Sequence, residues 1–249
     1  MNTAFTDRFG AFADTYAAFR PAYPDALFAW LADHAPDTEH AWDCATGNGQ
    51  AAVALAAHFD RVTATDASAA QLAHATPHPR VTYRQAPAEA SGLGDASADL
   101  VTVAQALHWF DRPAFYAEAE RVLRPGGLLA VWTYALATVS PEVDRVTDVL
   151  YRQTLEGYWS PARQQVEDGY AGFDFPFEPV EAPPFAMERA WPLARWVGYL
   201  RSWSAAGAYR KATGEDPVPE AALAEAWGDA ATRTVRWPLT LYVRRKPGA

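Results

Sequence analysis

Short apolar runs alternate with helical patterns between residues 41 and 134. This alternation is typical of parallel strands that are joined by crossover helices. The apolar runs predict five strands, over residues 41–45, 61–66, 80–85, 99–104 and 127–133. We therefore expect an α/β protein with a doubly wound, mostly parallel sheet.

The clearest helix is predicted over residues 112–123. Asp111 precedes it as a capping residue, and Pro113 stands in the first turn, where a missing N–H group costs little. The sequence Arg-Pro-Gly-Gly at 124–127 then ends the helix and turns the chain into the strand that follows.

The flanking segments do not continue this alternation. Residues 1–38 predict a helical cap segment with a helix that begins at Pro24. Beyond residue 135 the pattern predicts helices at about 140–156, 192–212 and 219–227, a Pro-rich link over 173–184, and strands near 185–191 and over 234–246. We assign residues 39–135 and 231–249, with the strand near 185–191, to the α/β core. Residues 136–184 and 192–230 are assigned to a helical lid inserted before the last strand.

Composition excludes several classes of function. The net charge is −9 and the 21 basic residues are scattered, so we expect no nucleic acid partner. No stretch approaches the ~18 apolar residues of a membrane span, and no basic region with an apolar run opens the chain. These features predict a cytoplasmic protein with no membrane partner, either a monomer or a homodimer. The single cysteine excludes an internal disulfide, and no zinc motif predicts a bound metal.

The loop after the first predicted strand carries the strongest candidate chemistry. Gly47 and Gly49 stand just before a helix that opens at Gln50. Glycines let the backbone approach a ligand closely, and a helix start offers free N–H groups, so the loop predicts a nucleotide-type site. The same glycines fit the dinucleotide fingerprint, and Asp66 is a ribose-binding acid for either kind of cofactor. An NAD-dependent oxidoreductase therefore stays open at this point, as does a non-catalytic cofactor-binding module.

Asp43, immediately before the loop, separates the two cofactors. Its negative charge would repel a pyrophosphate but would attract the ammonium group of S-adenosylmethionine. This favours a methyl donor over a dinucleotide.

Four motifs carry a resemblance to a known family. They are DCATGNGQ over 43–50, the strand-end Asp66, QALHWFD over 105–111 and LRPGG over 123–127. Together they resemble the class I S-adenosylmethionine-dependent methyltransferases of the trans-aconitate methyltransferase-like group. Further segments are similar to that group, so the resemblance covers nearly the whole chain: YAAFRPAYP (16–24), YWSPARQQVEDGY (158–170), YLRSWSA (199–205) and WPLTLYVRRK (237–246).

The resemblance implies a seven-stranded, Rossmann-like sheet that binds S-adenosyl-L-methionine and releases S-adenosyl-L-homocysteine, with no metal. Gly47 and Gly49 are then expected to lie against the methionine portion, and Asp66 to accept hydrogen bonds from the ribose. Ala67 and Ser68 would flank the adenine. Other matching positions with an implied cofactor contact are Ala45, Gln50, Ala88, Glu89, Gln105 and Trp109. For Glu89 the alternative interpretation is a solvated loop acid.

The N-terminal element contributes three further residues by resemblance. Arg20 is expected to pair with the cofactor carboxylate, and Tyr16 and Tyr23 to fold over the cofactor. Packed tyrosines beside a surface arginine are the structural alternative. The loop also departs from the family: Ala45 and Thr46 replace a usual glycine and a frequent cysteine, and Cys44 replaces an aliphatic residue. We interpret Cys44 as a buried filler rather than a nucleophile.

His108 is the candidate catalytic residue, since it follows a site-forming strand and could orient or deprotonate an acceptor. Trp109 beside it could surround the sulfonium. The residues predicted to bind the acceptor are Tyr23, His108, Trp159, Arg163, Arg201 and Trp203. Arginines beside aromatics could bind an acidic small molecule. The alternative is that these arginines lie on the solvent-exposed face of a helix, over packed aromatic side chains.

The predicted reaction is therefore methylation of a small molecule, with the oxygen of a carboxylic acid as the favoured acceptor. A carboxylate is already ionised at neutral pH and needs no base. A hydroxyl, thiol or amine remains the alternative acceptor, and each usually must lose a proton.

Overall fold

The computed structural model describes residues 21–248, and its centre is a seven-stranded sheet in the order β3-β2-β1-β4-β5-β9-β6. The strands are β1 (His40–Cys44), β2 (Arg61–Asp66), β3 (Val81–Gln85), β4 (Ala98–Ala104), β5 (Leu123–Thr133), β6 (Glu178–Val180) and β9 (Thr240–Arg245). The first five are parallel to one another, whereas β9 is antiparallel to both β5 and β6. The doubly wound, mostly parallel sheet is confirmed.

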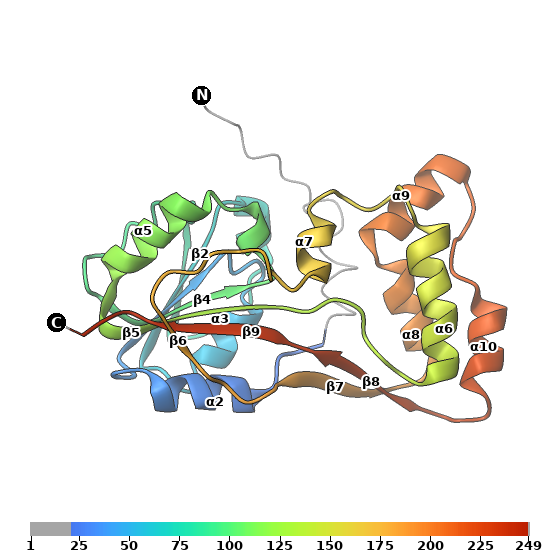
Figure 1. Cartoon of the computed structure of the whole chain (residues 1–249), viewed down its shortest axis with the longest axis horizontal. Helices are drawn as coiled ribbons and strands as arrows, with labels where there is room; N and C mark the ends of the chain where they lie inside the picture. The colour runs from blue at the N-terminus through green and yellow to red at the C-terminus, as the bar shows by residue number, and fades with distance from the viewer. Residues whose placement is uncertain (1–20, 249) are drawn as a thin grey trace.

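Helices cover both faces of this sheet (Figure 1). On one face α2 (Asp25–His34) and α3 (Gln50–Leu55) bury Phe28, Leu31 and Leu55. On the other face α5 (Arg112–Val122) buries Phe115, whose ring lies 6.2 Å from that of Trp42 on β1. The short helix α4 (Ala69–Ala73) follows β2. Alternate strand residues thus enter two separate apolar layers, as a sheet buried on both faces requires.

The N-terminus of α5 confirms the capping prediction. The side chain of Asp111 accepts a hydrogen bond from the Ala114 backbone N–H at 3.3 Å, and a proline stands in the first turn. At the other end of this helix the chain enters β5 at Leu123, so the strand begins earlier than the predicted residue 127.

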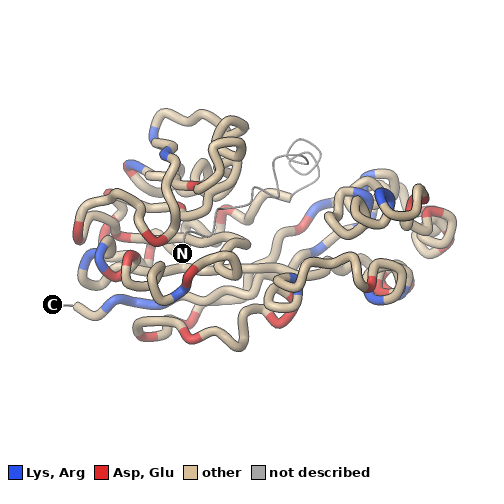
Figure 2. The backbone as a smooth tube through the Cα atoms, turned by 90° about the horizontal axis from the view of Figure 1, so that it is seen from above, with Lys and Arg blue, Asp and Glu red and all other residues tan. Residues whose placement is uncertain are grey.

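A helical unit with its own core lies beyond the carboxyl edge of the sheet (Figures 1 and 2). It contains α6 (Pro141–Val149) with a π-helical turn (Leu150–Thr154), α8 (Leu193–Arg201), α9 (Ser204–Thr213), α10 (Glu220–Trp227) and a two-stranded sheet of β7 (Ala186–Trp191) and β8 (Arg233–Pro238). Trp196, Trp227 and Trp237 are fully buried in its apolar cluster. The short helix α7 (Arg163–Glu167) lies between the helical unit and the sheet (Figure 1).

Two predictions about the strands are wrong. The strand near 185–191 is not part of the α/β core, because β7 pairs only with β8 in the two-stranded sheet. The seventh strand is instead β6, inside the Pro-rich link that was assigned to the lid. A three-residue strand with a central proline gives no periodic signal, and it is tolerated because an edge strand needs hydrogen bonds on one side only.

The run over 234–246 is two strands rather than one. β8 ends at Pro238 and β9 begins at Thr240, so the chain changes sheets at Leu239, whose N–H donates to Phe185 O at 2.9 Å. The predicted helix over 192–212 is likewise two helices, α8 and α9, separated at Ser202 and Trp203. Within residues 21–248, every helix is too short or too polar to cross a bilayer.

Candidate functional site

The loop between β1 and α3 has the backbone conformation of a ligand cradle. Ala45, Gly47 and Gly49 have positive φ angles of 55°, 58° and 85°. This left-handed region is costly for alanine and free for glycine, so the loop shape depends on its two glycines. Thr46 N donates to Thr65 O at 2.9 Å and ties the loop to the end of β2.

Gly49 is required for a second reason, because a β-carbon at this position would lie 2.1 Å from Tyr83 Oη and 2.8 Å from its Cζ. The Tyr83 hydroxyl donates to Thr76 O at 2.7 Å, so this ring is held across the loop. At Gly47 a β-carbon would find its nearest neighbour, the Gln71 side chain, at 3.8 Å. The space above Gly47 is therefore open, while that above Gly49 is filled.

Asp43 places a buried carboxylate beneath the loop. Its two oxygens accept hydrogen bonds from Thr46 Oγ1 at 2.5 Å and Thr102 Oγ1 at 2.7 Å. Burial raises the pKa of Asp43 to about 6, although both hydroxyls and the Ala52 backbone oppose the rise. The neighbouring carboxylate of Asp66 raises the pKa further. A nearby cation would favour the ionised form of Asp43.

Asp66 joins the loop to the end of β2. One of its carboxylate oxygens accepts from Gly47 N and the other from Ser68 N, each at 2.8 Å. Ser68 in turn caps α4 by accepting from Gln71 N, and Ala67 O accepts from Gln85 Nε2 at 3.0 Å. The predicted ribose-binding acid and the two residues after it are therefore adjacent to the glycine loop.

The N-terminal segment meets the same loop. Gln50 Nε2 donates to Pro21 O at 3.0 Å, so its side chain holds the start of the described chain. Tyr23 packs edge-on against Trp132 at 5.4 Å and lies 6.5 Å from Tyr134, at the end of β5. The predicted contacts of Tyr16 and Arg20 lie outside the described residues.

Gln105 follows β4 in a left-handed conformation, with φ 57°. Its side-chain oxygen accepts from Thr133 Oγ1 at 2.6 Å and its nitrogen donates to Tyr134 O at 2.9 Å. The carboxamide thus ties the ends of β4 and β5 together, which differs from the expected contact with a ligand. Glu89 is also engaged, since it accepts from Asp111 N at 3.1 Å next to the buried Ala88.

His108 lies in a 3₁₀ turn (Leu107–Trp109) that follows β4. Its Nδ1 lies 2.8 Å from Tyr170 Oη, and the exposed ring of Trp109 is 4.7 Å away. Burial and then the charge of Arg163 lower the pKa of His108 to about 4, so the imidazole is neutral near pH 7. Tyr170 was not predicted as a site residue, although it ends the segment 158–170 that carries the resemblance.

Three of the predicted acceptor-binding residues form one cluster. The rings of Trp159 and Trp203 are 5.6 Å apart, and each packs against Tyr151. Arg163 lies over the Trp159 ring at 5.3 Å, and its Nε donates to Tyr151 Oη at 2.5 Å. Glu167 accepts from the Tyr151 hydroxyl and lies 3.7 Å from Arg163 Nε. This aromatic–arginine cluster connects α7 to the π-helical turn of the helical unit.

Arg201 does not join the cluster, and this corrects its predicted role. Its guanidinium donates to Asp216 at 2.6 Å and to Glu220 at 2.7 Å. These ion pairs connect α8 to the start of α10, so the charge of Arg201 is already neutralised inside the helical unit. Arg201 and Trp203 have different partners because α8 ends at Arg201 and the chain changes direction before α9 begins.

Cys44 is buried and free, and burial raises the pKa of its thiol well above the ordinary value. This fits the predicted filler role, since the thiolate is the nucleophile.

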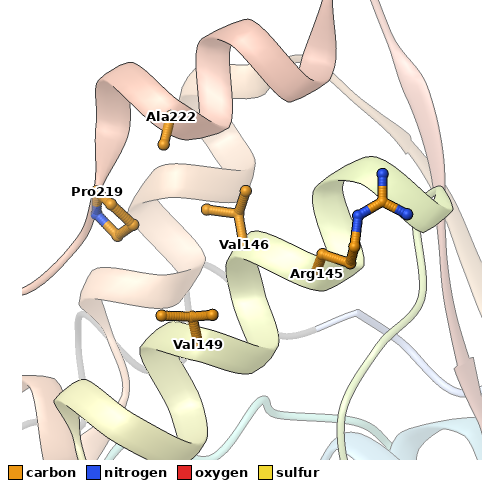
Figure 3. A pocket seen from close by; sticks show the side chains of 5 residues that line it. All are labelled: Arg145, Val146, Val149, Pro219 and Ala222. Carbon is orange, nitrogen blue, oxygen red and sulfur yellow. The ribbon is translucent and has the colours of Figure 1, made fainter.

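A hollow between α6 and α10 is lined by Arg145, Val146, Val149, Pro219 and Ala222 (Figure 3). Both helices belong to the helical unit, which lies beyond the carboxyl edge of the sheet (Figure 1). The acidic, histidine and cysteine side chains of residues 21–248 form no group of three that could hold a metal. The glycine loop, the ends of β2 and β4, and the aromatic–arginine cluster together make the candidate site.

We predict that Gly49→Ala lowers the free energy of unfolding by more than Gly47→Ala does. Both substitutions carry a left-handed penalty of about 1–2 kcal/mol, but only the first adds a clash with Tyr83. Chemical denaturation of both variants measures the difference. In a Tyr83→Ala background the Gly49→Ala cost should fall to that of Gly47→Ala, and an unchanged cost would contradict the steric explanation.

Comparisons with known proteins identify the family. Residues 42–131 match the family model described as "Methyltransferase domain". A candidate methyltransferase of Dictyostelium discoideum is 34% identical in an alignment 254 residues long, gaps included. This alignment covers 98% of this chain and 97% of that protein. A solved structure of a candidate type II methyltransferase from Anaeromyxobacter dehalogenans is 48% identical with a TM-score of 0.88, covering 93% of this chain and 100% of that chain.

A more distant structure shares the fold alone. It is a phosphoethanolamine N-methyltransferase of Haemonchus contortus, solved with S-adenosylhomocysteine, at 16% identity and a TM-score of 0.51, covering 97% of this chain and 58% of that chain. The long alignment to the Dictyostelium protein and the seven-stranded sheet agree with each other. The chain therefore belongs to the methyltransferase family and has the class I fold.

Proposed function

We propose that this chain is an S-adenosylmethionine-dependent methyltransferase that transfers a methyl group to a carboxylate oxygen of a small molecule. The observation that carries the acceptor class is the pairing of a fixed cation, Arg163, with a neutral His108 beside the carboxyl edge of the sheet. The motif resemblance to the trans-aconitate methyltransferase-like group supports the same acceptor class.

The glycine loop supports the cofactor. The cradle above Gly47 is open, the buried carboxylate of Asp43 lies beneath the loop, and Asp66 stands at the end of the next strand. We expect Asp66 to receive the ribose hydroxyls and Asp43 to attract the cofactor ammonium through its threonine-bound carboxylate. When bound, S-adenosylmethionine supplies a methyl group on a positively charged sulfur.

The acceptor end of the site supports an anionic substrate. Arg163 is held at its Nε by Tyr151, and a planar guanidinium fork matches the two oxygens of a carboxylate. Trp159 and Trp203 pack beside it and would exclude water from the bound acid. Transfer to a carboxylate needs alignment rather than a base, because the nucleophile is already ionised.

A hydroxyl acceptor fits these residues less well. It needs a group that takes up a proton near neutral pH, and burial and Arg163 lower the pKa of His108 to about 4. A base of that strength removes a proton from a hydroxyl poorly. We therefore propose that His108 orients the acceptor.

Asp66→Ala should weaken S-adenosylhomocysteine binding by more than about tenfold, since charge-assisted hydrogen bonds contribute about 1.5–3 kcal/mol each. Isothermal calorimetry measures the change, and Asp229→Ala, an exposed acid on the helical unit, is the matched control. Titration of the unmodified protein with NAD belongs to the same experiment. Unchanged affinity in Asp66→Ala would refute the ribose contact, and tight NAD binding without S-adenosylhomocysteine binding would refute the proposed cofactor.

The affinity for S-adenosylhomocysteine should fall as the pH drops below about 6. Above this pH Asp43 is ionised and attracts the ammonium group, and below it the carboxyl is protonated and the attraction is lost. At pH 5, about one unit below the raised pKa of Asp43, only about a tenth of these carboxyls are ionised. The affinity for S-adenosylhomocysteine can therefore fall by at most roughly tenfold between pH 7.5 and pH 5. Asp43→Asn should remove this dependence, and an equal slope in that variant would assign it to another group.

A labelled-methyl screen over dicarboxylic and tricarboxylic acids, phenols, thiols and amines tests the acceptor. We expect transfer to a carboxylic acid, with Arg163→Gln raising KM by about tenfold or more through loss of a bidentate ion pair. Arg201→Gln is the matched control, because its guanidinium is bound to Asp216 and Glu220. Transfer to phenols or amines with no transfer to any acid would overturn the proposed acceptor.

A further inference from the structure

A buried tyrosine that was not predicted as a site residue contacts the candidate catalytic histidine. Tyr170 is 1% exposed, and its ring stacks on Phe173 at 4.9 Å with an interplanar angle of 12°. It follows Gly169 in a tight turn, and both residues have positive φ angles, 62° and 59°. The turn is fixed to the sheet, because Gly169 O accepts from Tyr242 Oη of β9 at 2.8 Å.

The strained turn has a consequence for the Tyr170 hydroxyl. A positive φ at a bulky residue is uncommon and persists only where the surroundings stabilise it. Here the conformation delivers Tyr170 Oη to within 2.8 Å of His108 Nδ1. The hydrogen bond holds together the turn after α7 and the turn after β4, which are distant in the sequence.

The direction of this hydrogen bond decides the chemistry of His108. Burial raises the pKa of Tyr170 and lowers that of His108, so both groups are neutral near pH 7. The Thr133 hydroxyl and then the backbone N–H groups of His108 and Leu107 lower the pKa of the Tyr170 hydroxyl, as hydrogen-bond donors to its oxygen do. A phenol oxygen accepts few hydrogen bonds, so a further N–H donor from Nδ1 would be poorly accommodated. The opposite direction remains, in which the phenol O–H donates a hydrogen bond to Nδ1.

We propose that Tyr170 is a positioning residue whose hydroxyl donates to His108 Nδ1, so that the imidazole carries its proton on Nε2 and presents this N–H to an anionic acceptor. The tautomer of a histidine is set by the partner of its other nitrogen. A neutral imidazole with a protonated Nε2 can donate at that atom and cannot accept there.

The second donor comes from Arg163. Its Nε is bound to Tyr151, and within residues 21–248 neither Nη of Arg163 nor Nε2 of His108 has a hydrogen-bond partner in the protein. Arg163 is close enough to His108 for its charge to lower the imidazole pKa. The acceptor end therefore offers donors from two side chains and selects a carboxylate over a hydroxyl. This selectivity rests on the proposed function, whereas the tautomer itself does not.

Nitrogen-15 NMR of the full chain with labelled histidine tests the tautomer without any acceptor. The chain has six histidines, and loss of one signal set in His108→Gln assigns the residue. We expect His108 with a protonated Nε2 and an unprotonated, hydrogen-bonded Nδ1. In Tyr170→Phe, which keeps the stacked ring, the Nδ1 signal should move to the position of an unbound nitrogen. A protonated Nδ1 in the unmodified protein would overturn the proposal.

Tyr116→Phe is the matched control for this experiment. In the part of the chain that the structure describes, the Tyr116 hydroxyl is buried without a hydrogen-bond partner, so its removal should leave the His108 signals unchanged. Equal shifts of the His108 signals in both variants would mean a general effect of losing a buried hydroxyl, and would also overturn the proposal.

Kinetics separate this proposal from the acceptor class. With a carboxylic acid acceptor, Tyr170→Phe should raise the acceptor KM about three- to tenfold, as expected for one misplaced donor, while the affinity for S-adenosylhomocysteine stays unchanged. Transfer to an acid with a protonated Nδ1 would refute the role of Tyr170 and leave the proposed function standing. A protonated Nε2 in a protein that methylates only phenols or amines would support the tautomer and refute the acceptor class.

Discussion

The buried carboxylate of Asp43 is the interaction on which the candidate site depends. It lies on β1, and β1 pairs with β2 on one side and with β4 on the other. The strand order reverses here, because the chain passes from β1 to β2 and β3 on one side and then returns to β4 on the other side. Doubly wound folds bind ligands at this point. Asp43 accepts from Thr46 in the loop and from Thr102 on β4, so one carboxylate fixes both sides of the switch point. Burial makes its charge costly, and a bound cation reduces that cost.

The conformation of the glycine loop depends on residues that are distant in the sequence. Asp43 and Asp66 hold the loop from below and from the side, and Tyr83 limits it from above. Since Gly49 touches Tyr83 closely, the side chain of the third strand takes part in shaping a loop that follows the first strand. A loop with three left-handed residues is thus maintained by contacts with three strands in addition to its two glycines.

Sequence reasoning predicted the elements whose signals are local. The strand positions from β1 to β4 follow from apolar runs, and α5 from Asp111 and the proline in its first turn. β6 was missed because three residues with a central proline carry no period. In the site, the glycine loop and Asp66 were predicted to contact one cofactor, and they are adjacent in the structure because they lie at the ends of neighbouring parallel strands.

The contacts of Gln105, Arg201 and Tyr170 did not follow from sequence reasoning, because their partners lie far along the chain. A glutamine after a strand resembles a ligand contact, and only the folded chain shows that Thr133 and Tyr134 occupy its amide. Arg201 and Arg163 both stand beside a tryptophan in sequence, and only the folded chain shows that Asp216 and Glu220 bind the Arg201 guanidinium. Tyr170 lies 62 residues from His108, and its contact depends on a left-handed turn that no periodicity predicts.

The segment from α7 to Tyr170 joins the two halves of the candidate site physically. At its start Arg163 binds Tyr151 of the helical unit, and at its end Tyr170 binds His108 beside the sheet. A displacement of this segment would therefore move the arginine and release the imidazole together. Burial and then the charge of Arg163 keep His108 neutral, so the proposed Nε2–H donor adds no second cation. In the proposed reaction Arg163 and His108 would both face the acceptor carboxylate, so a displacement of this segment would change acceptor binding and the alignment of the reacting oxygen together.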